Sequence, residues 1–268
     1  MSRPLDPSRR SPTAGLPTPE PIAPPSWLAG EAEAIGVAFE TGEPERLGFY
    51  LALLLQANTT MNLTAITEPD AAWRRHILDS LTLVGALAEL PEGSCVADIG
   101  SGGGLPGVPL AVCMPHLRFT LVEATGKKVE FLRRVVAAMG LGNVEVVQQR
   151  AEEFGQDRGI KTNAGREQVR REAYDAVTAR AVARLASLAE LTVPAAKVGG
   201  RVLLIKGEKA GEELIEAEPA LHLLKAVHAG TIETPTGKIV VLEKRSATPR
   251  DYPRRDGEPT RRPLGVAS

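Results

Sequence analysis

The stretch from Val96 to Gly107 has the clearest chemical potential, because one acid there precedes several glycines. An apolar segment over 95–99 predicts a buried strand, and Pro109 stands in the first turn of a predicted helix. Glycine lets the main chain approach a ligand closely, and a helix N-terminus offers free N–H groups. Strand, glycine turn and helix together predict an element that binds a nucleotide.

Two frames of this loop predict different ligands. Gly102, Gly104 and Gly107 fit the dinucleotide pattern Gly-x-Gly-x-x-Gly, but in a loop this rich in glycine some register nearly always fits. The better frame runs from Asp98 through Gly100 and Gly102 to Gly104. A carboxylate at the end of the strand would repel a diphosphate and suits a ligand with a cationic end. S-adenosylmethionine, with its ammonium and sulfonium, is such a ligand, and this frame is similar to motif I of the class I methyltransferases.

A second acid, Glu123, ends the next predicted strand, over 119–123. In a doubly wound sheet a carboxylate at this point binds ribose hydroxyls. NAD-dependent enzymes use the same device, so Glu123 indicates an adenosine-containing ligand without choosing between the two. The alternative is that Asp98 and Glu123 are ordinary capping or surface acids.

Composition excludes some classes of protein. The chain has 268 residues, 43% of them hydrophobic, and a net charge of −1, which neither requires nor excludes nucleic acid. Its two cysteines have no partners at metal-ligand spacing, so we expect a reducing compartment, the cytoplasm, and no metal. No apolar run approaches the roughly 20 residues of a membrane span, so we expect no membrane partner.

Three polar segments stand apart from the predicted core. Residues 1–26 hold eight of the 21 prolines and predict a disordered leader. Residues 246–268 hold five arginines and predict an extended, basic C-terminal arm. The stretch 155–172 predicts a surface insertion with a helix near 166–172.

The rest of the chain predicts two parts, a helical cap over 27–90 and an α/β domain over 91–245. The cap includes one helix over about 70–87. Strands are predicted over 94–99, 119–123, 143–148, 174–178 and 200–205. The intervening helices are predicted over 109–114, 126–139, 184–197 and 210–224. Two final apolar runs, 226–232 and 238–243, predict a hairpin, so the layout predicts a Rossmann-like, seven-stranded and mostly parallel sheet.

Short motifs spread along this layout add a family resemblance. They are Asn62–Thr64, Arg75–Leu81, the glycine loop, Lys127–Leu132, Arg150–Glu153, Thr178–Ala181, Ile205–Gly207 and Tyr252–Arg255. In this order and spacing the chain resembles the glucose-inhibited division protein B family, the ribosomal RNA small subunit methyltransferases G. The resemblance covers about Leu47 to Leu264, and neither the leader nor the insertion belongs to the usual pattern.

The resemblance implies methyl transfer from S-adenosylmethionine to N7 of a guanine in 16S rRNA, near the decoding site. It implies that Gly100 and Leu105 line the methionine and ribose portions of the cofactor. Glu123, Ala124 and Thr125 would meet the ribose, Ala151 and Glu152 the adenine, and Arg180 the space between cofactor and substrate. The full expected cofactor set is Asp98, Gly100, Gly102, Leu105, Glu123, Ala124, Thr125, Ala151, Glu152 and Arg180.

The expected chemistry needs no general base, because guanine N7 has a free lone pair and the enzyme must mainly hold three atoms in line. We therefore expect no catalytic residue beyond Arg180 as a positioning residue. Thr178–Ala181 replaces the Asn/Asp-Pro-Pro-aromatic motif that grips an exocyclic amine, and neither cysteine lies in a loop suited to attack a pyrimidine. Adenine N6, cytosine N4 and cytosine C5 are thus disfavoured, whereas small-molecule acceptors remain open.

The partner that we expect is 16S rRNA or the small ribosomal subunit, bound by a monomer. The RNA-binding candidates are Arg75, His76, Lys127, Lys128, Arg184 and Lys206, since βα loops meet at the carboxyl ends of strands. His76 could equally be a core-edge histidine bonded to a polar neighbour. Three alternatives stay open: a nicotinamide-dependent oxidoreductase, a non-catalytic RNA-binding or assembly factor, and a small-molecule methyltransferase.

Overall fold

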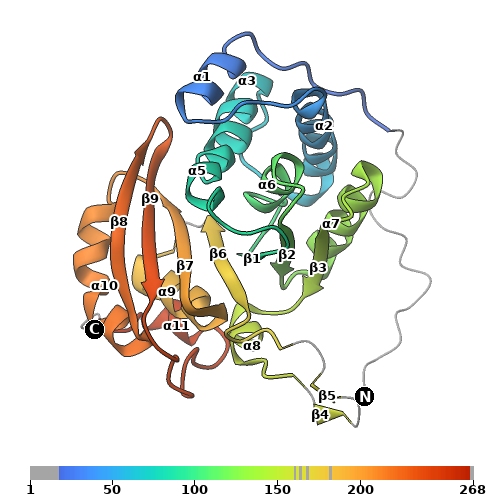
Figure 1. Ribbon diagram of the computed structural model, residues 1–268. Coiled ribbons are helices and arrows are strands. Elements are labelled where there is room, and N and C mark those ends of the chain that lie inside the picture. The colour runs from blue at the N-terminus through green and yellow to red at the C-terminus, as the bar shows by residue number, and fades with distance from the viewer. Residues whose placement is uncertain (1–17, 160, 163–164, 167–168, 181–182, 266–268) are drawn as a thin grey trace.

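The computed structural model describes residues 18–159, 161–162, 165–166, 169–180 and 183–265. A seven-stranded sheet in the order β3-β2-β1-β6-β7-β9-β8 forms the centre of the molecule (Figure 1). Its strands are β1 Cys95–Ile99, β2 Arg118–Glu123, β3 Val144–Gln148, β6 Tyr174–Arg180, β7 Ala196–Lys206, β8 Ala226–Thr234 and β9 Gly237–Lys244. Only β9 runs antiparallel to its neighbours, so the predicted Rossmann-like, mostly parallel sheet with its final hairpin is confirmed.

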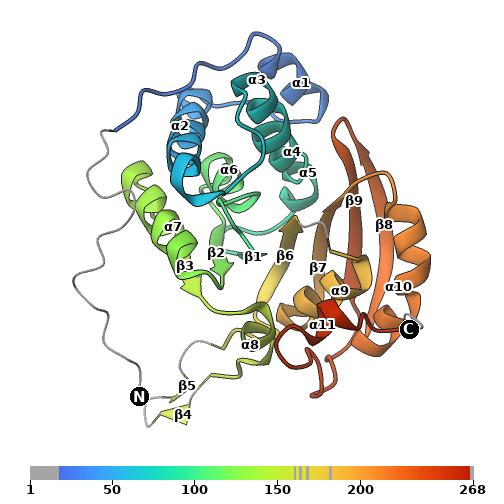
Figure 2. The same ribbon diagram turned by 180° about the vertical axis from the view of Figure 1, so that it is seen from behind.

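Helices cover both faces of the sheet (Figures 1 and 2). One face carries α6 (Gly107–Cys113) and α7 (Gly126–Met139), and the other α8 (Ala151–Gln156), α9 (Leu185–Thr192) and α10 (Ala210–Leu224). Helix α7 shows why the sequence folds this way, because Val129, Leu132 and Val135 recur at a spacing of three and are buried. A short 3₁₀ turn over 193–195 follows α9, and α11 spans Glu258–Arg261.

The N-terminal helices lie over α6 and α7 and share their hydrophobic cluster. They are α1 Leu28–Ala34, α2 Glu43–Met61, α3 Pro69–Ala72, a π-helix Trp73–Leu78, α4 Asp79–Leu81 and α5 Val84–Leu87. The single α-helix predicted over 70–87 was therefore wrong in detail. Apolar spacing locates the buried face, but it does not distinguish an α-turn from the wider π-turn, which occurs often at functional sites.

The predicted leader is partly ordered. Residues 1–17 lie outside the described residues, whereas 18–26 run along α2, where Ile22 N–H donates to Gly48 O at 3.1 Å. A Cβ on Gly48 would lie 2.2 Å from Ile22 O, so the glycine permits this close approach. The prediction of disorder fails for 18–26, because backbone pairing with α2 does not require apolar sequence.

The insertion and the C-terminal arm also differ from prediction. Within the described part of 155–172, Lys161–Thr162 (β4) pairs with Gly165–Arg166 (β5), and 169–172 contains no helix. Arg171 is only 6% exposed and donates to the carbonyls of Gly155, Thr248, Pro249 and Tyr252. Residues 246–265 are therefore docked on the domain and do not form an extended arm, because three of their carbonyls accept hydrogen bonds from the buried Arg171.

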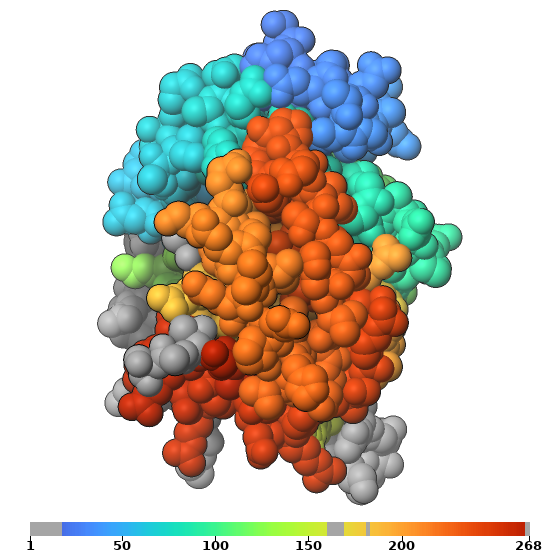
Figure 3. Space-filling model, turned by 90° about the vertical axis from the view of Figure 1, so that its left-hand side faces the viewer, coloured from blue at the N-terminus to red at the C-terminus, as the bar shows by residue number. Residues whose placement is uncertain are grey.

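The hairpin β8–β9 forms the opposite edge of the sheet. Figure 3 shows this side, where the tip of the hairpin lies against the helical cap. Ile215 of α10 and Val227 and Ile232 of β8 are among its exposed apolar side chains. Among the described residues, no helix is both long enough and apolar enough to cross a membrane.

Candidate functional site

The predicted cofactor residues end neighbouring strands at one edge of the sheet. Asp98 is in register with Leu121 of β2 and Thr178 of β6. Just beyond β1, Gly100 N–H donates to Val122 O at 2.9 Å, which keeps Gly100 beside the end of β2 and Glu123, while Arg180 ends β6 on the other side of β1. This alignment follows from the parallel direction of β2, β1 and β6, whose carboxyl ends share one edge.

The glycine turn divides into an open part and a packed part. Gly100 is exposed, has φ +74°, and has no atom within 4 Å of the position of an ideal Cβ. A Cβ on Gly107 would instead lie 2.2 Å from Leu121 Cδ2, so this glycine lets α6 pack on β2. Leu105 is buried in the cluster shared with the cap. The space next to Gly100 is thus the part of the turn that a ligand can enter.

Glu123 is held by the backbone on both of its carboxylate oxygens. Gly102 N–H donates to Oε2 at 3.1 Å and Thr125 N–H donates to Oε1 at 2.7 Å. A carboxylate has about four acceptor positions, so it can also accept from two hydroxyls of a ribose. Ala124 and Thr125 are exposed beside it. The structure therefore places the predicted ribose residues together at the rim of the open space.

Asp98 differs from the prediction that its carboxylate faces a cationic ligand. It is fully buried, with Oδ2 accepting from Gly107 N–H at 3.2 Å and Oδ1 from Thr178 Oγ1 at 3.3 Å. Burial raises the pKa of Asp98 to about 6 from its ordinary value. The side chain points into the turn and stabilises the N-terminus of α6, so any effect on a ligand acts through its charge and the loop it holds.

The predicted adenine residues lie at the start of α8, where Ala151 is the first helical residue. Glu152 is 6% exposed, and its Oε1 accepts from Gly257 N–H at 2.7 Å. Its Oε2 lies 3.7 Å from Arg150 Nε. Glu152 thus already binds the C-terminal segment, a contact that the sequence did not predict.

Arg180 ends β6 and is fixed by two hydrogen bonds from one nitrogen. Its Nη1 donates to Arg75 O at 2.7 Å and to Asp79 Oδ2 at 3.2 Å. Asp79 also accepts from the hydroxyl of Thr236, in the β8–β9 turn. Arg180 therefore stands at a junction of the cap, β6 and the hairpin.

The predicted RNA residues fall into two groups. Lys127 and Arg184 are exposed, Lys128 is half-buried, and none of the three has an ion pair within the described ranges. Arg75 is also exposed, although its Nη1 donates to Thr236 O at 2.8 Å.

Lys206 and His76 are buried instead. Lys206 Nζ donates to Ala183 O and pairs with Glu213 at 2.8 Å, while His76 Nε2 lies 2.9 Å from Thr64 Oγ1. Burial and the charge of Arg180 lower the pKa of His76 to about 4, which keeps it neutral near pH 7. The predicted RNA set therefore narrows to Arg75, Lys127, Lys128 and Arg184.

Three residues of the site were not predicted as site residues. Tyr50 of α2 is fully buried and donates to Gly103 O at 2.8 Å, which ties the cap to the glycine turn. Asp79 and Thr236 hold Arg180 from the cap and the hairpin. Tyr50 could have been noticed as the one hydroxyl on a buried helix face, and Asp79 lies within the Arg75–Leu81 motif. The sequence contains no local signal for Thr236.

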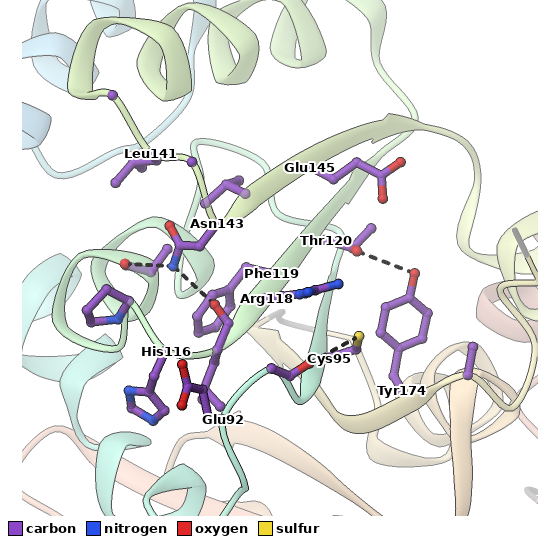
Figure 4. Close-up of a pocket in the computed structure, with 18 of the residues that line it drawn as sticks. Glu92, Cys95, His116, Arg118, Phe119, Thr120, Leu141, Asn143, Glu145 and Tyr174 are labelled. Carbon is purple, nitrogen blue, oxygen red and sulfur yellow. Dashed lines mark hydrogen bonds between the residues drawn. The ribbon is translucent and has the colours of Figure 1, made fainter.

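A second cavity, of about 1100 Å³, lies at the other end of the parallel strands (Figure 4). Arg118, Asn143 and Tyr174 line it, together with residues at the starts of β1 and β3. Both amide hydrogens of Asn143 are used by backbone carbonyls, and Tyr174 donates to Thr120. The cavity is therefore separate from the glycine turn, and the polar groups of Asn143 and Tyr174 already have partners within the protein.

A Rossmann-like sheet with an open glycine turn and an acid on the next strand defines a nucleotide-binding protein of the class I methyltransferase fold. The family model for rRNA small subunit methyltransferase G matches residues 43–238. The chain belongs to this family, which confirms the predicted resemblance.

Individual relatives agree with the family. A ribosomal RNA small subunit methyltransferase G of Sorangium cellulosum is 49% identical over 251 residues, 94% of this chain and 100% of the relative. One from Streptococcus pyogenes is 38% identical over 239 residues, 87% of this chain and 96% of the relative. The solved structure of a SAM dependent methyltransferase from Aquifex aeolicus has a TM-score of 0.46 at 16% identity, covering 63% of this chain and 91% of that one. That last likeness is too distant to bear on activity.

Proposed function

We propose that this protein transfers a methyl group from S-adenosylmethionine to N7 of a guanine in 16S rRNA. Family membership supports an rRNA substrate and a methyl donor. The observation that carries the proposal is the exposed Gly100, which has no atom within 4 Å of its ideal Cβ position and lies beside the end of β2, where Glu123 stands. An exposed glycine there accepts a ligand where a side chain would intrude, and Glu123 suits its ribose.

The proposed cofactor set follows from this geometry. Gly100, Gly102 and Leu105 form the turn, Glu123 with Ala124 and Thr125 binds the ribose, and Ala151 and Glu152 border the adenine. Asp98 supports the turn from inside. When bound, the cofactor supplies an electrophilic methyl group on sulfur. At Gly100 no atom lies within 4 Å of the ideal Cβ position, which leaves this face of the turn accessible to the cofactor.

The proposed reaction is a single displacement. The N7 lone pair forms the new bond to the methyl carbon, and the electron pair of the breaking C–S bond stays on sulfur as a thioether. Positive charge moves from sulfur to the base, and no proton is transferred. The protein therefore needs to orient the base and exclude competing geometries, and such positioning can account for a large part of a rate enhancement.

The proposed RNA contacts are Arg75, Lys127, Lys128 and Arg184, which are the cationic candidates that the fold leaves accessible. Phosphate contacts of this kind release counterions, so binding should weaken as salt rises. A ribosomal substrate would place the protein in the cytoplasm. One chain contains every residue of the proposed site, which is consistent with action as a monomer.

The test is incubation of small ribosomal subunits, from cells lacking the gene, with labelled S-adenosylmethionine. We expect label in a 7-methylguanine of 16S rRNA, located by digestion and mass spectrometry. Glu123→Ala and Gly100→Val should each weaken binding of S-adenosylhomocysteine, and Arg180→Ala should slow transfer at saturating cofactor. Cofactor binding without label in RNA would favour an assembly factor, and heat from NAD alone would favour an oxidoreductase.

A further inference from the structure

Four hydrogen bonds close a ring between the cap, β6 and the hairpin turn. Arg180 donates to Arg75 O, and Arg75 donates to Thr236 O. The Thr236 hydroxyl donates to Asp79 Oδ1, and Asp79 Oδ2 accepts from Arg180 Nη1. We call these four residues the Arg180 ring. It joins residues 157 positions apart in sequence, Asp79 and Thr236.

We propose that Asp79 is the positioning residue of Arg180, and that Thr236 makes the β8–β9 turn part of the active site. The inference rests on the proposed function, because it assigns these residues to the same rim. Asp79 is 5% exposed, so its charge is removed from most of the solvent screening that weakens surface pairs. Within the described residues, it is the only carboxylate that pairs with Arg180.

The ring fixes the direction in which Arg180 presents its remaining donors. Arg75 O and Asp79 take both hydrogens of Nη1, so the plane of the guanidinium is set. Nη2 and Nε have no hydrogen-bond partner within the described ranges, and the side chain is 23% exposed. These N–H groups suit an anionic oxygen at the rim, either the carboxylate of the cofactor or a phosphate of the RNA.

The β8–β9 turn is held in place by contacts with the end of β7 and within the turn. A Cβ on Gly237 would lie 2.5 Å from Lys206 O, so the glycine brings the turn against the end of β7. Thr234 Oγ1 also donates to Gly237 O at 2.9 Å. Thr236 is therefore held at the level of Arg180 by contacts that do not involve Asp79. The Thr236 hydroxyl, which donates to Asp79, therefore links the placement of Asp79 to that of the turn.

The experiment compares Asp79→Asn, Thr236→Val and Arg180→Ala with the wild-type protein. Asp175→Asn is the matched control. Asp175 lies in β6, as Arg180 does, but at the other end of that strand, and it forms an ion pair with Lys197 of β7 at 2.7 Å. The measurements are the dissociation constants for S-adenosylhomocysteine and for small ribosomal subunits, with kcat and KM for methyl transfer. The two dissociation constants can be measured without turnover. They therefore test the role of Asp79 and Thr236 even if the protein does not transfer a methyl group to RNA.

We expect Asp79→Asn to lower kcat/KM by about tenfold to a hundredfold, since misplacing a positioning group by about 1 Å has effects of that order. Thr236→Val should lower it less, by about two- to tenfold, because it removes one hydrogen bond to the Asp79 carboxylate and leaves the pair between Asp79 and Arg180 in place. A raised dissociation constant for S-adenosylhomocysteine would identify the cofactor carboxylate as the anion. A raised constant for ribosomal subunits alone would identify RNA phosphate.

A double variant separates positioning from general stability. If Asp79 acts through Arg180, Asp79→Asn should have no further effect in the Arg180→Ala protein. The inference is overturned if the two losses multiply, or if both dissociation constants and kcat stay within about twofold of wild type in Asp79→Asn and Thr236→Val. Thr236→Val removes a single hydroxyl from a half-buried turn, so it decides the matter even if Asp79→Asn fails to fold. An equal loss in Asp175→Asn would also contradict the inference.

Discussion

Replacing Asp98 by asparagine should remove a pH dependence of stability that burial creates. The pKa of Asp98 is raised from 3.8 to about 6 because its carboxylate is enclosed by the glycine turn. The folded protein therefore holds this proton more tightly than the unfolded chain does. The resulting stabilisation is complete below pH 3.8 and is lost as the pH rises through 6. A difference of about two pKa units corresponds to about 3 kcal/mol.

Asparagine can keep both hydrogen-bond contacts that the carboxylate makes. Its amide oxygen can accept from Gly107 N–H, and its amide nitrogen can donate to Thr178 Oγ1, in the places where Asp98 now accepts. The variant does not titrate. Its free energy of unfolding, minus that of the wild type, should therefore rise with pH and level off above about pH 7, by about 3 kcal/mol relative to the value in acid.

Urea denaturation of both proteins at intervals from pH 4 to pH 8 measures this difference. Titrations shared by the two proteins cancel in the subtraction, which isolates position 98. A flat difference across the range would refute the reasoning, because it would mean that Asp98 has the same proton affinity in both states. A falling difference would show that hydrogen bonds to the carboxylate outweigh its desolvation.

Three further substitutions test separate contacts. Tyr50→Phe should lower the free energy of unfolding by about 1–3 kcal/mol, because Gly103 O loses a buried donor; an unchanged urea midpoint would contradict this. Gly107→Ala should lower the free energy of unfolding by about 1–3 kcal/mol in the same assay, since its Cβ would lie 2.2 Å from Leu121 Cδ2. A urea midpoint equal to that of the wild type would mean that α6 can shift to accommodate the methyl group. Arg171→Met should expose 246–265 to limited proteolysis before the rest of the chain, because four carbonyls lose their donor; equal cleavage rates would count against the docked segment.

The part of the site that the sequence predicts is the part that strand order determines. Gly100, Glu123 and Arg180 each follow an apolar segment, and parallel strands bring such positions to one edge. The helices over 126–139 and 210–224 were placed correctly for a similar reason, since the spacing of apolar residues marks the buried face of each helix. In these cases the local residue pattern and the order of neighbouring strands are sufficient to predict the position of the residue or helix.

Buried charges account for most of what the sequence could not show. Arg171, Arg254 and Lys206 look like surface residues in a linear sequence, yet each is paired inside the protein. Arg171 donates to carbonyls up to 81 positions away, and Arg254 pairs with Glu190, which is 64 positions away and fully buried. The pair between Lys206 and Glu213 is closer in sequence, but it joins the end of β7 to α10. Charged residues are expected at the surface unless they are paired. The tertiary contacts that pair these residues cannot be read from the linear sequence.

The two ends of the candidate site are bordered by segments that follow the last strand–helix unit. On the side of Arg180, the hairpin turn reaches Asp79 through Thr236. On the side where adenine is proposed to bind, Gly257 donates to Glu152, and Arg150 pairs with Asp256 at 3.0 Å. The parallel strands therefore contribute the centre of the candidate site, and these two later segments contribute contacts at its ends. A change in either segment should therefore affect ligand binding without altering the glycine turn itself.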